Sequence, residues 1–215
     1  MKNNITELVF ILDRSGSMSG LEDDTVGGFN SLIEKQTTVD AKCFVTTVLF
    51  NNSIVTIHDR KELREIRPLT RNDFVPSGCT ALLDAIGQTI RHINSIHKYA
   101  RQEDVPEHTT FVIMTDGMEN SSRFFTSDEV KSMIETAKEK HGWEFLFLAA
   151  NIDAVETASR MGIRPDRSVD YLADDMGTQV AYEAVAEAIC KARMSCPIDA
   201  SWSNSIRADR KKRGK

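Results

Sequence analysis

The chain of 215 residues has no long hydrophobic run. No stretch approaches the roughly 20 consecutive apolar residues that a membrane helix needs. The apolar run nearest the N-terminus is short, follows polar residues and ends in an aspartate, which argues against a secretion signal. The sequence therefore predicts a cytoplasmic protein with no membrane partner.

Cysteine and histidine are few and scattered, with four cysteines and five histidines in the chain. The cysteines form no Cys-x-x-Cys pair and have no histidines at zinc spacing, so neither a zinc site nor a disulfide is predicted. Cys79 adjoins Thr80, and sensitivity to oxidation is the alternative there to an ordinary loop role. The histidines are interpreted as surface or linker residues and not as general bases.

Motifs of common enzymes are also missing from the sequence. There is no glycine-rich Walker loop and no Gly-x-Ser-x-Gly elbow. A phosphotransferase of the haloacid dehalogenase type would place Asp13 after a buried strand, but would want a second aspartate where Ser15 stands. No catalytic residue is predicted. A metal-dependent hydrolase stays as the alternative, because a hydrated Mg²⁺ beside carboxylates can activate water.

What is present is the composition and the alternating pattern of a globular α/β domain. Hydrophobic residues make up 40% of the chain and charged residues 27%, which is too apolar for disorder. Apolar runs predict strands at 8–12, 43–50, 53–58, 110–115, 143–150 and 167–171. Helical spacing predicts helices at 21–37, from 82 onward, at 126–142 and 155–161, and a final helix around 180–189.

This alternation predicts a doubly wound, mostly parallel sheet with helices on both faces. One strand is expected to be antiparallel, because Asn51 and Asn52 can adopt the left-handed conformations of a two-residue hairpin. Thr126 begins a predicted capping box, and Gly142 and Gly162 are predicted to end helices. In such folds ligands bind beyond the carboxyl ends of the strands, at a switch in strand order.

Five oxygen-bearing residues lie in the loops around that edge. They are Asp13, Ser15, Ser17, Thr80 and Asp116. In an extended loop, residues two apart can face the same way, so Asp13, Ser15 and Ser17 can converge on one ion. Two carboxylates and three hydroxyls, with no imidazole or thiolate, suit a hard divalent cation. The alternative is that the hydroxyls merely cap turns and helices.

The set resembles the metal-ion-dependent adhesion site (MIDAS) of von Willebrand factor A-type (VWA) domains. That site has the pattern Asp-x-Ser-x-Ser, then a distant Thr and a more distant Asp, and this chain matches each position in order. The short string alone is a weak signal because its residues are common in loops, whereas five matches in fitting contexts are a strong one. The resemblance covers about residues 5–193 and implies the same doubly wound, Rossmann-like fold.

The resemblance also implies how each residue would act. Ser15 and Ser17 would bind the ion directly, and Thr80 would bind it directly or through water. Asp13 and Asp116 would often act through waters. Few direct carboxylates leave the ion partly hydrated and electrophilic, so that it accepts an Asp or Glu of a partner protein. Mg²⁺ is the predicted ion, with Mn²⁺ or Ca²⁺ as alternatives.

The function predicted from the resemblance is an intracellular, metal-dependent protein-binding module of the scaffold or assembly kind. Its implied partners include an ATPase or a stress-response system. Arg14 and Glu119 lie in loops near the predicted ion, where they either select a partner by charge or are exposed residues without a role. No enzyme activity is predicted.

The sequence predicts a single VWA-like domain over 1–195 and a C-terminal extension with a basic tail over 196–215. The basic residues of the tail are Arg207, Arg210, Lys211, Lys212, Arg213 and Lys215. We expect a solvated, disordered end, because no aromatic residue interleaves with these charges. Binding of nucleic acid or of an acidic protein is the alternative. Trp202 is expected to hold residues 201–205 against the domain.

Overall fold

The computed structural model describes residues 4–214. Within that range six strands form one sheet in the order β3-β2-β1-β4-β5-β6. The strands are β1 (Thr6–Asp13), β2 (Cys43–Phe50), β3 (Ile54–Glu62), β4 (His108–Thr115), β5 (Glu144–Ala149) and β6 (Ser168–Asp170). β3 is an edge strand antiparallel to β2, and the other neighbouring strands are parallel. The predicted fold class is confirmed.

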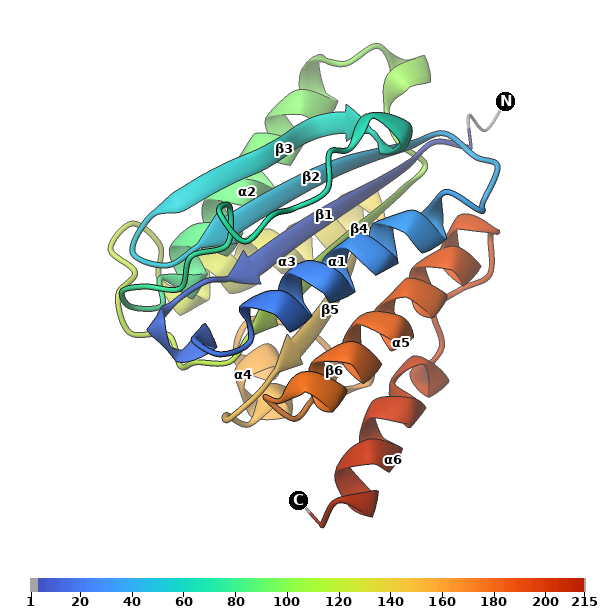
Figure 1. Cartoon of the computed structure of the whole chain (residues 1–215). Helices are drawn as coiled ribbons and strands as arrows, with labels where there is room; N and C mark the ends of the chain where they lie inside the picture. The colour runs from blue at the N-terminus through green and yellow to red at the C-terminus, as the bar shows by residue number, and fades with distance from the viewer. Residues whose placement is uncertain (1–3, 215) are drawn as a thin grey trace.

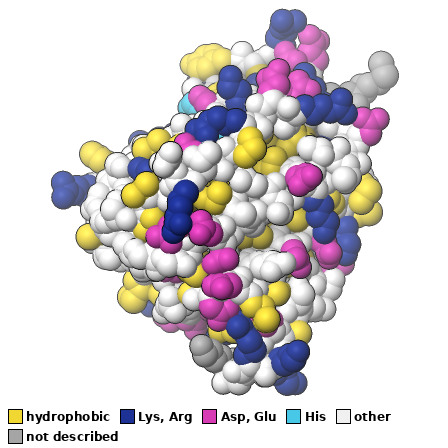
Figure 2. Space-filling view, viewed as in Figure 1, with side chains coloured by type: hydrophobic (Ala, Val, Ile, Leu, Met, Phe, Trp, Pro, Cys, Tyr) yellow, Lys and Arg dark blue, Asp and Glu magenta, His cyan; other side chains and the backbone are white. Residues whose placement is uncertain are grey.

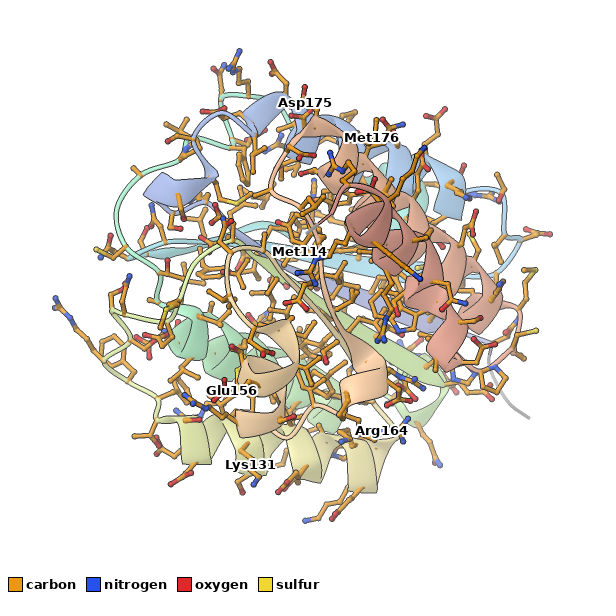
Figure 3. All side chains as sticks on the ribbon, turned by 90° about the horizontal axis from the view of Figure 1, so that it is seen from below. Met114, Lys131, Glu156, Arg164, Asp175 and Met176 are labelled. Atoms are coloured by element: carbon orange, nitrogen blue, oxygen red, sulfur yellow. The ribbon has the colours of Figure 1, made fainter. Side chains whose placement is uncertain are left out.

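Helices cover both faces of this sheet (Figure 1). They are α1 (Glu22–Gln36), α2 (Leu82–Tyr99), α3 (Ser127–His141), α4 (Ala154–Arg160), α5 (Asp175–Arg193) and α6 (Asn204–Lys212). Residues of α1, α5 and α6 share one hydrophobic cluster with the sheet, and residues of α2, α3 and α4 share the other. Figure 3 shows this layering, with Met114 of β4 between Glu156 of α4 and Asp175 of α5.

Short 3-10 helices lie in the connections between these elements. They are η1 (Gly16–Met18), η2 (Leu63–Glu65), η3 (Gln102–Asp104), η4 (Pro165–Arg167) and η5 (Ala200–Ser203).

The central strand β1 is buried on both faces. Leu8, Phe10 and Leu12 belong to the cluster on the α1 and α5 side, whereas Val9 and Ile11 belong to the cluster on the α2 side. Alternate residues of a strand point to opposite faces, so both faces must be apolar when helices cover both. This explains the continuous apolar run that ends at the carboxyl edge of the sheet.

The strand order reverses between β1 and β4. From β1 the chain passes through α1 to β2 on one side, while β4 pairs with β1 on the other side. The connections that leave β1 and β4 therefore diverge and leave room beyond the strand ends. The loops that carry the candidate metal residues lie at this position.

The predicted helix signals are confirmed. Thr126 accepts a hydrogen bond from the Glu129 backbone, and the Glu129 side chain accepts one from the Thr126 backbone, which is a capping box. Gly142 ends α3 at φ 65°, and Gly162 follows α4 at φ 75°. These are left-handed conformations that glycine adopts without steric cost.

The predicted left-handed hairpin is wrong. Neither Asn51 nor Asn52 is among the residues with positive φ in the described range. The Asn51 side chain instead accepts a hydrogen bond from the Ser53 backbone at 2.9 Å, and β3 begins only at Ile54. A three-residue loop closed by an asparagine side chain therefore replaces the two-residue turn.

The expected disordered end is also wrong for the residues that the structure describes, because Asn204–Lys212 form the helix α6. The preceding Trp202 is 8% exposed and donates its indole N–H to the Asp166 carbonyl at 2.9 Å. Ile206 is 1% exposed within the α1 and α5 cluster. The expectation that Trp202 holds its neighbours against the domain is thus confirmed.

Part of the basic charge of the tail is neutralised within the fold. Arg210 pairs with Asp170 at 3.0 Å, and Arg213 pairs with Asp174 at 2.9 Å. Asp174 is the N-cap of α5, so Arg213 joins the end of α6 to the start of α5. These ion pairs join segments about 40 residues apart and help to hold the tail in place, which the expectation of a disordered end did not take into account.

A pair of adjacent glycines in α1 provides a test of the α1–α5 contact. A Cβ at Gly28 would overlap the ring of Tyr182 in α5, whereas a Cβ at Gly27 would meet nothing within 4 Å. We expect Gly28→Ala to lower the free energy of unfolding by about 1–3 kcal/mol through overpacking. Gly27→Ala should raise it by roughly 0.5–1 kcal/mol through helix propensity. Urea denaturation of both variants measures this, and equal effects would contradict the described contact.

Candidate metal site

The candidate site lies where three loops meet at the carboxyl edge of the sheet (Figure 1). The loop after β1 bonds to the loop before α2, through the Gly16 N–H and the Gly78 carbonyl at 3.0 Å. The loop after β4 bonds to the same segment, through the Asn120 N–H and the Thr80 carbonyl at 3.1 Å. Backbone hydrogen bonds thus hold together loops that are distant in sequence.

Four of the five candidate residues are joined by hydrogen bonds. The Ser17 hydroxyl donates to Asp116 Oδ1 at 2.6 Å, and the Ser15 and Ser17 hydroxyls are 3.0 Å apart. The Ser15 backbone N–H donates to Asp13 Oδ1 at 2.7 Å. The structure therefore brings residues from the loops after β1 and β4 into one cluster.

Gly117 shows where the fifth residue, Thr80, stands. A Cβ built on Gly117 would lie 3.1 Å from Thr80 Oγ1, 3.3 Å from Ser17 Oγ and 3.9 Å from Ser15 Oγ. All three predicted hydroxyls therefore lie within 4 Å of the position that a Cβ at residue 117 would occupy, and glycine leaves this space open. Oxygen donors of this kind suit a small hard cation.

The two carboxylates of the cluster are buried, with Asp13 1% exposed and Asp116 2% exposed. Burial raises the pKa of Asp13 above its usual value, although hydrogen bonds from Thr115 and Ser15 oppose the shift. Burial also raises the pKa of Asp116, and the nearby Asp13 charge adds to the effect. Neither is in an ion pair with Lys, Arg or His among residues 4–214. Two buried carboxylates close together without a basic partner are an electrostatic arrangement that a cation would stabilise.

Histidine, cysteine and further carboxylates do not add to the site. In the described part of the chain, no group of three or more His, Cys, Asp or Glu side chains is placed to hold a metal. The candidate site has only two such residues, so any ion here would depend on the hydroxyls of Ser15, Ser17 and Thr80. A set of this kind suits Mg²⁺, which retains water ligands, better than zinc, which prefers nitrogen and sulfur.

Three residues that were not predicted from the sequence hold the candidate residues or their neighbours in place through hydrogen bonds. The Thr115 hydroxyl donates to Asp13 Oδ2 at 2.6 Å. Asn120 Oδ1 accepts from the Thr80 N–H at 2.9 Å, and Asn52 Oδ1 accepts from the Cys79 N–H at 2.7 Å. Of these, only Thr115 carried a signal, as the residue directly before Asp116 at the end of a strand.

Glu119 and Arg14, predicted at the rim, have contacts within the fold. The Glu119 carboxylate accepts hydrogen bonds from the backbone of Leu83, Ser121 and Ser122 at 2.8–2.9 Å. Arg14 is half-buried, and its guanidinium lies 3.5 Å from the Ser53 hydroxyl of the β2–β3 hairpin. The contacts of Glu119 give it a role in positioning its loop, and the contact of Arg14 or Glu119 with a partner stays a prediction.

Comparison with known proteins identifies the fold. No protein-family model and no curated protein matches the sequence. Among solved structures, a von Willebrand factor type A protein from Catenulispora acidiphila is 12% identical with a TM-score of 0.57, covering 85% of this chain and 42% of that one. The ArnB paralog VWA2 from Sulfolobus acidocaldarius is 17% identical with a TM-score of 0.54, covering 87% and 45%. The chain has the fold of these VWA domains.

A third similar structure is proximal thread matrix protein 1 from the mussel byssus, described with a zinc-occupied MIDAS motif. It is 10% identical with a TM-score of 0.56, and the match covers 86% of this chain and 46% of that one. The present chain thus spans less than half the length of each of the three proteins. At these identities the likeness establishes the fold, and the fold places the candidate cluster at the switch between β1 and β4.

The buried carboxylates predict an unusual pH dependence of stability in the presence of a chelator. The pKa of Asp116 is higher in the folded than in the unfolded protein. The protonated carboxyl therefore contributes its full stability when the pH is below the pKa of the unfolded state, and this contribution is lost as the pH rises through the pKa of the folded state. Asp116→Asn should therefore be more stable than the parent protein at neutral pH. The difference should shrink as the pH falls toward about 4.

Asp73→Asn is a control of opposite sign. Hydrogen bonding to Arg67 holds the pKa of Asp73 well below its usual range. The ionised Asp73 therefore stabilises the folded protein when the pH is above the pKa of the unfolded state, and this contribution is lost as the pH falls into the acid range. Thermal unfolding in EDTA across the pH range measures both variants. A destabilised Asp116→Asn at neutral pH would contradict the described burial.

Proposed function

We propose that this protein is a divalent-cation-dependent protein-binding domain, in which the cation joins the cluster to an Asp or Glu of a partner. The observation that carries the proposal is the pair of buried carboxylates, Asp13 and Asp116, with no ion-pair partner in the described chain. Three hydroxyls accompany them around Gly117. The zinc-occupied MIDAS motif of the mussel protein supports the binding of a divalent cation by this fold.

The candidate residues differ in exposure, and their proposed roles differ accordingly. Ser17 is exposed and its hydroxyl contacts both Ser15 and Asp116, so it stands between solvent and the buried acids. Asp13 lies deeper, held by Thr115 and the Ser15 backbone. When bound, the cation would supply an electrophilic position that accepts a carboxylate oxygen from outside. Mg²⁺ is the proposed ion because it favours oxygen ligands and keeps waters, and Mn²⁺ or Ca²⁺ would use the same donors.

The proposed role is binding and not catalysis. The histidines near other acids lie elsewhere: His97 bonds to Glu7 at 2.6 Å and His92 to Asp59 at 2.7 Å. Neither of these pairs includes a candidate metal residue. The metal-dependent hydrolase is therefore kept only as an outcome of the experiments below.

The cellular setting is also part of the proposal. In residues 4–214 no helix combines the length and the apolar character needed to cross a bilayer. We propose a cytoplasmic scaffold or assembly factor, with an ATPase or a stress-response system among its partners. The resemblance to VWA domains is the support for these partners.

Metal binding can be tested with two serines of one loop. Ser17→Ala removes a hydroxyl from the cluster, whereas Ser19→Ala removes an exposed hydroxyl that donates to the Gly16 carbonyl at 2.8 Å. Calorimetric titration with MgCl₂ should show uptake by the parent protein and by Ser19→Ala. Ser17→Ala should bind at least roughly tenfold more weakly. No uptake by the parent protein, or equal affinities for the two variants, would contradict the metal site.

Partner binding can be tested by capture from lysate in Mg²⁺ against EDTA, with Asp13→Ala beside the parent protein. Captured partners should be lost in EDTA, which removes the cation, and with Asp13→Ala, which weakens cation binding. In both cases the carboxylate of the partner has no cation to bind. Circular dichroism of Asp13→Ala checks that the variant is folded. Capture that is indifferent to both changes rejects the proposal, and phosphate or ester turnover that Asp13→Ala abolishes would favour the hydrolase.

A further inference from the structure

Two large apolar side chains project from the loop that follows the candidate metal site. Met118 is 70% exposed and Phe124 is 74% exposed, although both are close in sequence to the buried Asp116. Val75, 55% exposed, lies on the neighbouring loop that leads to Thr80. Figure 2 shows that exposed hydrophobic side chains are spread singly over the visible surface, among polar and charged ones. We call Met118 and Phe124 the apolar rim.

The loop that carries the apolar rim is braced. Asp84, buried in the first turn of α2, accepts hydrogen bonds from the backbone N–H groups of Arg123, Phe124 and Phe125 at 2.8–2.9 Å. At the other end of the loop, Glu119 accepts backbone hydrogen bonds as described above. The backbone of the loop is therefore held in place with the two rim side chains exposed.

Phe125 fixes the direction of its neighbour. It is 5% exposed, it packs against Gly87 of α2, where a Cβ would overlap its ring, and the Arg91 guanidinium lies 4.3 Å from the ring centroid. The burial of Phe125 leaves Phe124 directed toward solvent. Apolar groups on a backbone that is held in place lose less conformational entropy on binding than those on a mobile loop, which favours their use in recognition.

Arg123 gives this loop an exposed positive charge that attracts an acidic partner. The carboxylates of Glu119 and Asp84 are occupied by backbone hydrogen bonds. Arg123, between the two rim residues, is exposed and has no ion pair within residues 4–214. The Arg123 guanidinium and two exposed apolar groups are thus on the loop that directly follows a site proposed to bind a carboxylate.

We infer that the apolar rim selects partner segments in which the acidic residue is flanked by apolar side chains. This inference rests on the proposed function and adds specificity to it. The metal-bound carboxylate would give orientation, while Met118 and Phe124 would bury the flanking side chains. An acidic segment with polar neighbours would leave the rim in water and lose that contribution.

Two synthetic peptides test this inference. Each carries a single Asp, flanked by Leu in one peptide and by Ser in the other, with blocked termini and a fluorescent label. Fluorescence anisotropy in MgCl₂ should show that the Leu-flanked peptide binds about tenfold more tightly, because burying an apolar side chain is worth that factor or more. The preference should disappear in Met118→Ser/Phe124→Ser, while Mg²⁺ uptake measured by calorimetry stays unchanged.

Met194→Ser and Tyr99→Ser are the matched controls. Met194 is 59% exposed and Tyr99 is 79% exposed, and they lie at the C-terminal ends of α5 and α2, away from the candidate site. Both variants should keep the preference. Mg²⁺ uptake without a preference for the Leu-flanked peptide overturns the inference and leaves the metal site standing. Absence of Mg²⁺ uptake by the parent protein overturns the proposed function, and the inference with it.

Discussion

The burial of Asp13 and Asp116 at the ends of β1 and β4 is the constraint on which this edge of the molecule depends. A buried carboxylate needs a cation or several hydrogen bonds. Elsewhere on β1, the fully buried Glu7 has basic neighbours, with a hydrogen bond to His97 at 2.6 Å and the Arg60 guanidinium at 3.5 Å. Asp13 and Asp116 have hydrogen bonds but no such basic partner in the described chain. The proposed cation would complete this arrangement.

The first turn of α2 acts as a platform for the loops around these carboxylates. Asp84 and Glu119 together bind the backbone of the loop after β4, and Asn120 joins that loop to Thr80. Carboxylates engaged by backbone N–H groups hold a loop without exposing charge. As a result, the same loop keeps Gly117 among the hydroxyls and holds the apolar rim outward, so the proposed ion and the proposed partner surface share one support.

The C-terminal helix α6 packs on the side of the sheet that α1 and α5 cover. α6 packs through Ile206, and its arginines pair with Asp170 and Asp174. Asp170 accepts the Ala154 N–H at the start of α4, and Asp174 caps α5. The basic segment therefore pairs with acids that already accept backbone N–H groups at the starts of α4 and α5.

The sequence predicted most of the fold because its strongest signals are local. Apolar runs such as 8–12 bury both faces of a strand, and Thr126 and Gly142 mark helix ends through contacts a few residues away. The five candidate metal residues were also recognisable, since each follows or precedes such a local element. The structure places their side chains together, and metal binding itself stays a prediction.

The sequence by itself thus determined the strands, the helix ends and the residue types at the carboxyl edge, because hydrophobic periodicity and capping act over a few residues. Only the tertiary structure decided the packing of α6, the roles of Asp84 and Glu119, and the turn at Asn51, whose side chain also donates to the Ser77 carbonyl at 2.9 Å. Each of these depends on hydrogen bonds, ion pairs or packing whose geometry follows from the folded backbone. For Asp84 the bonded backbone lies about 40 residues along the chain, and no local pattern can encode that distance.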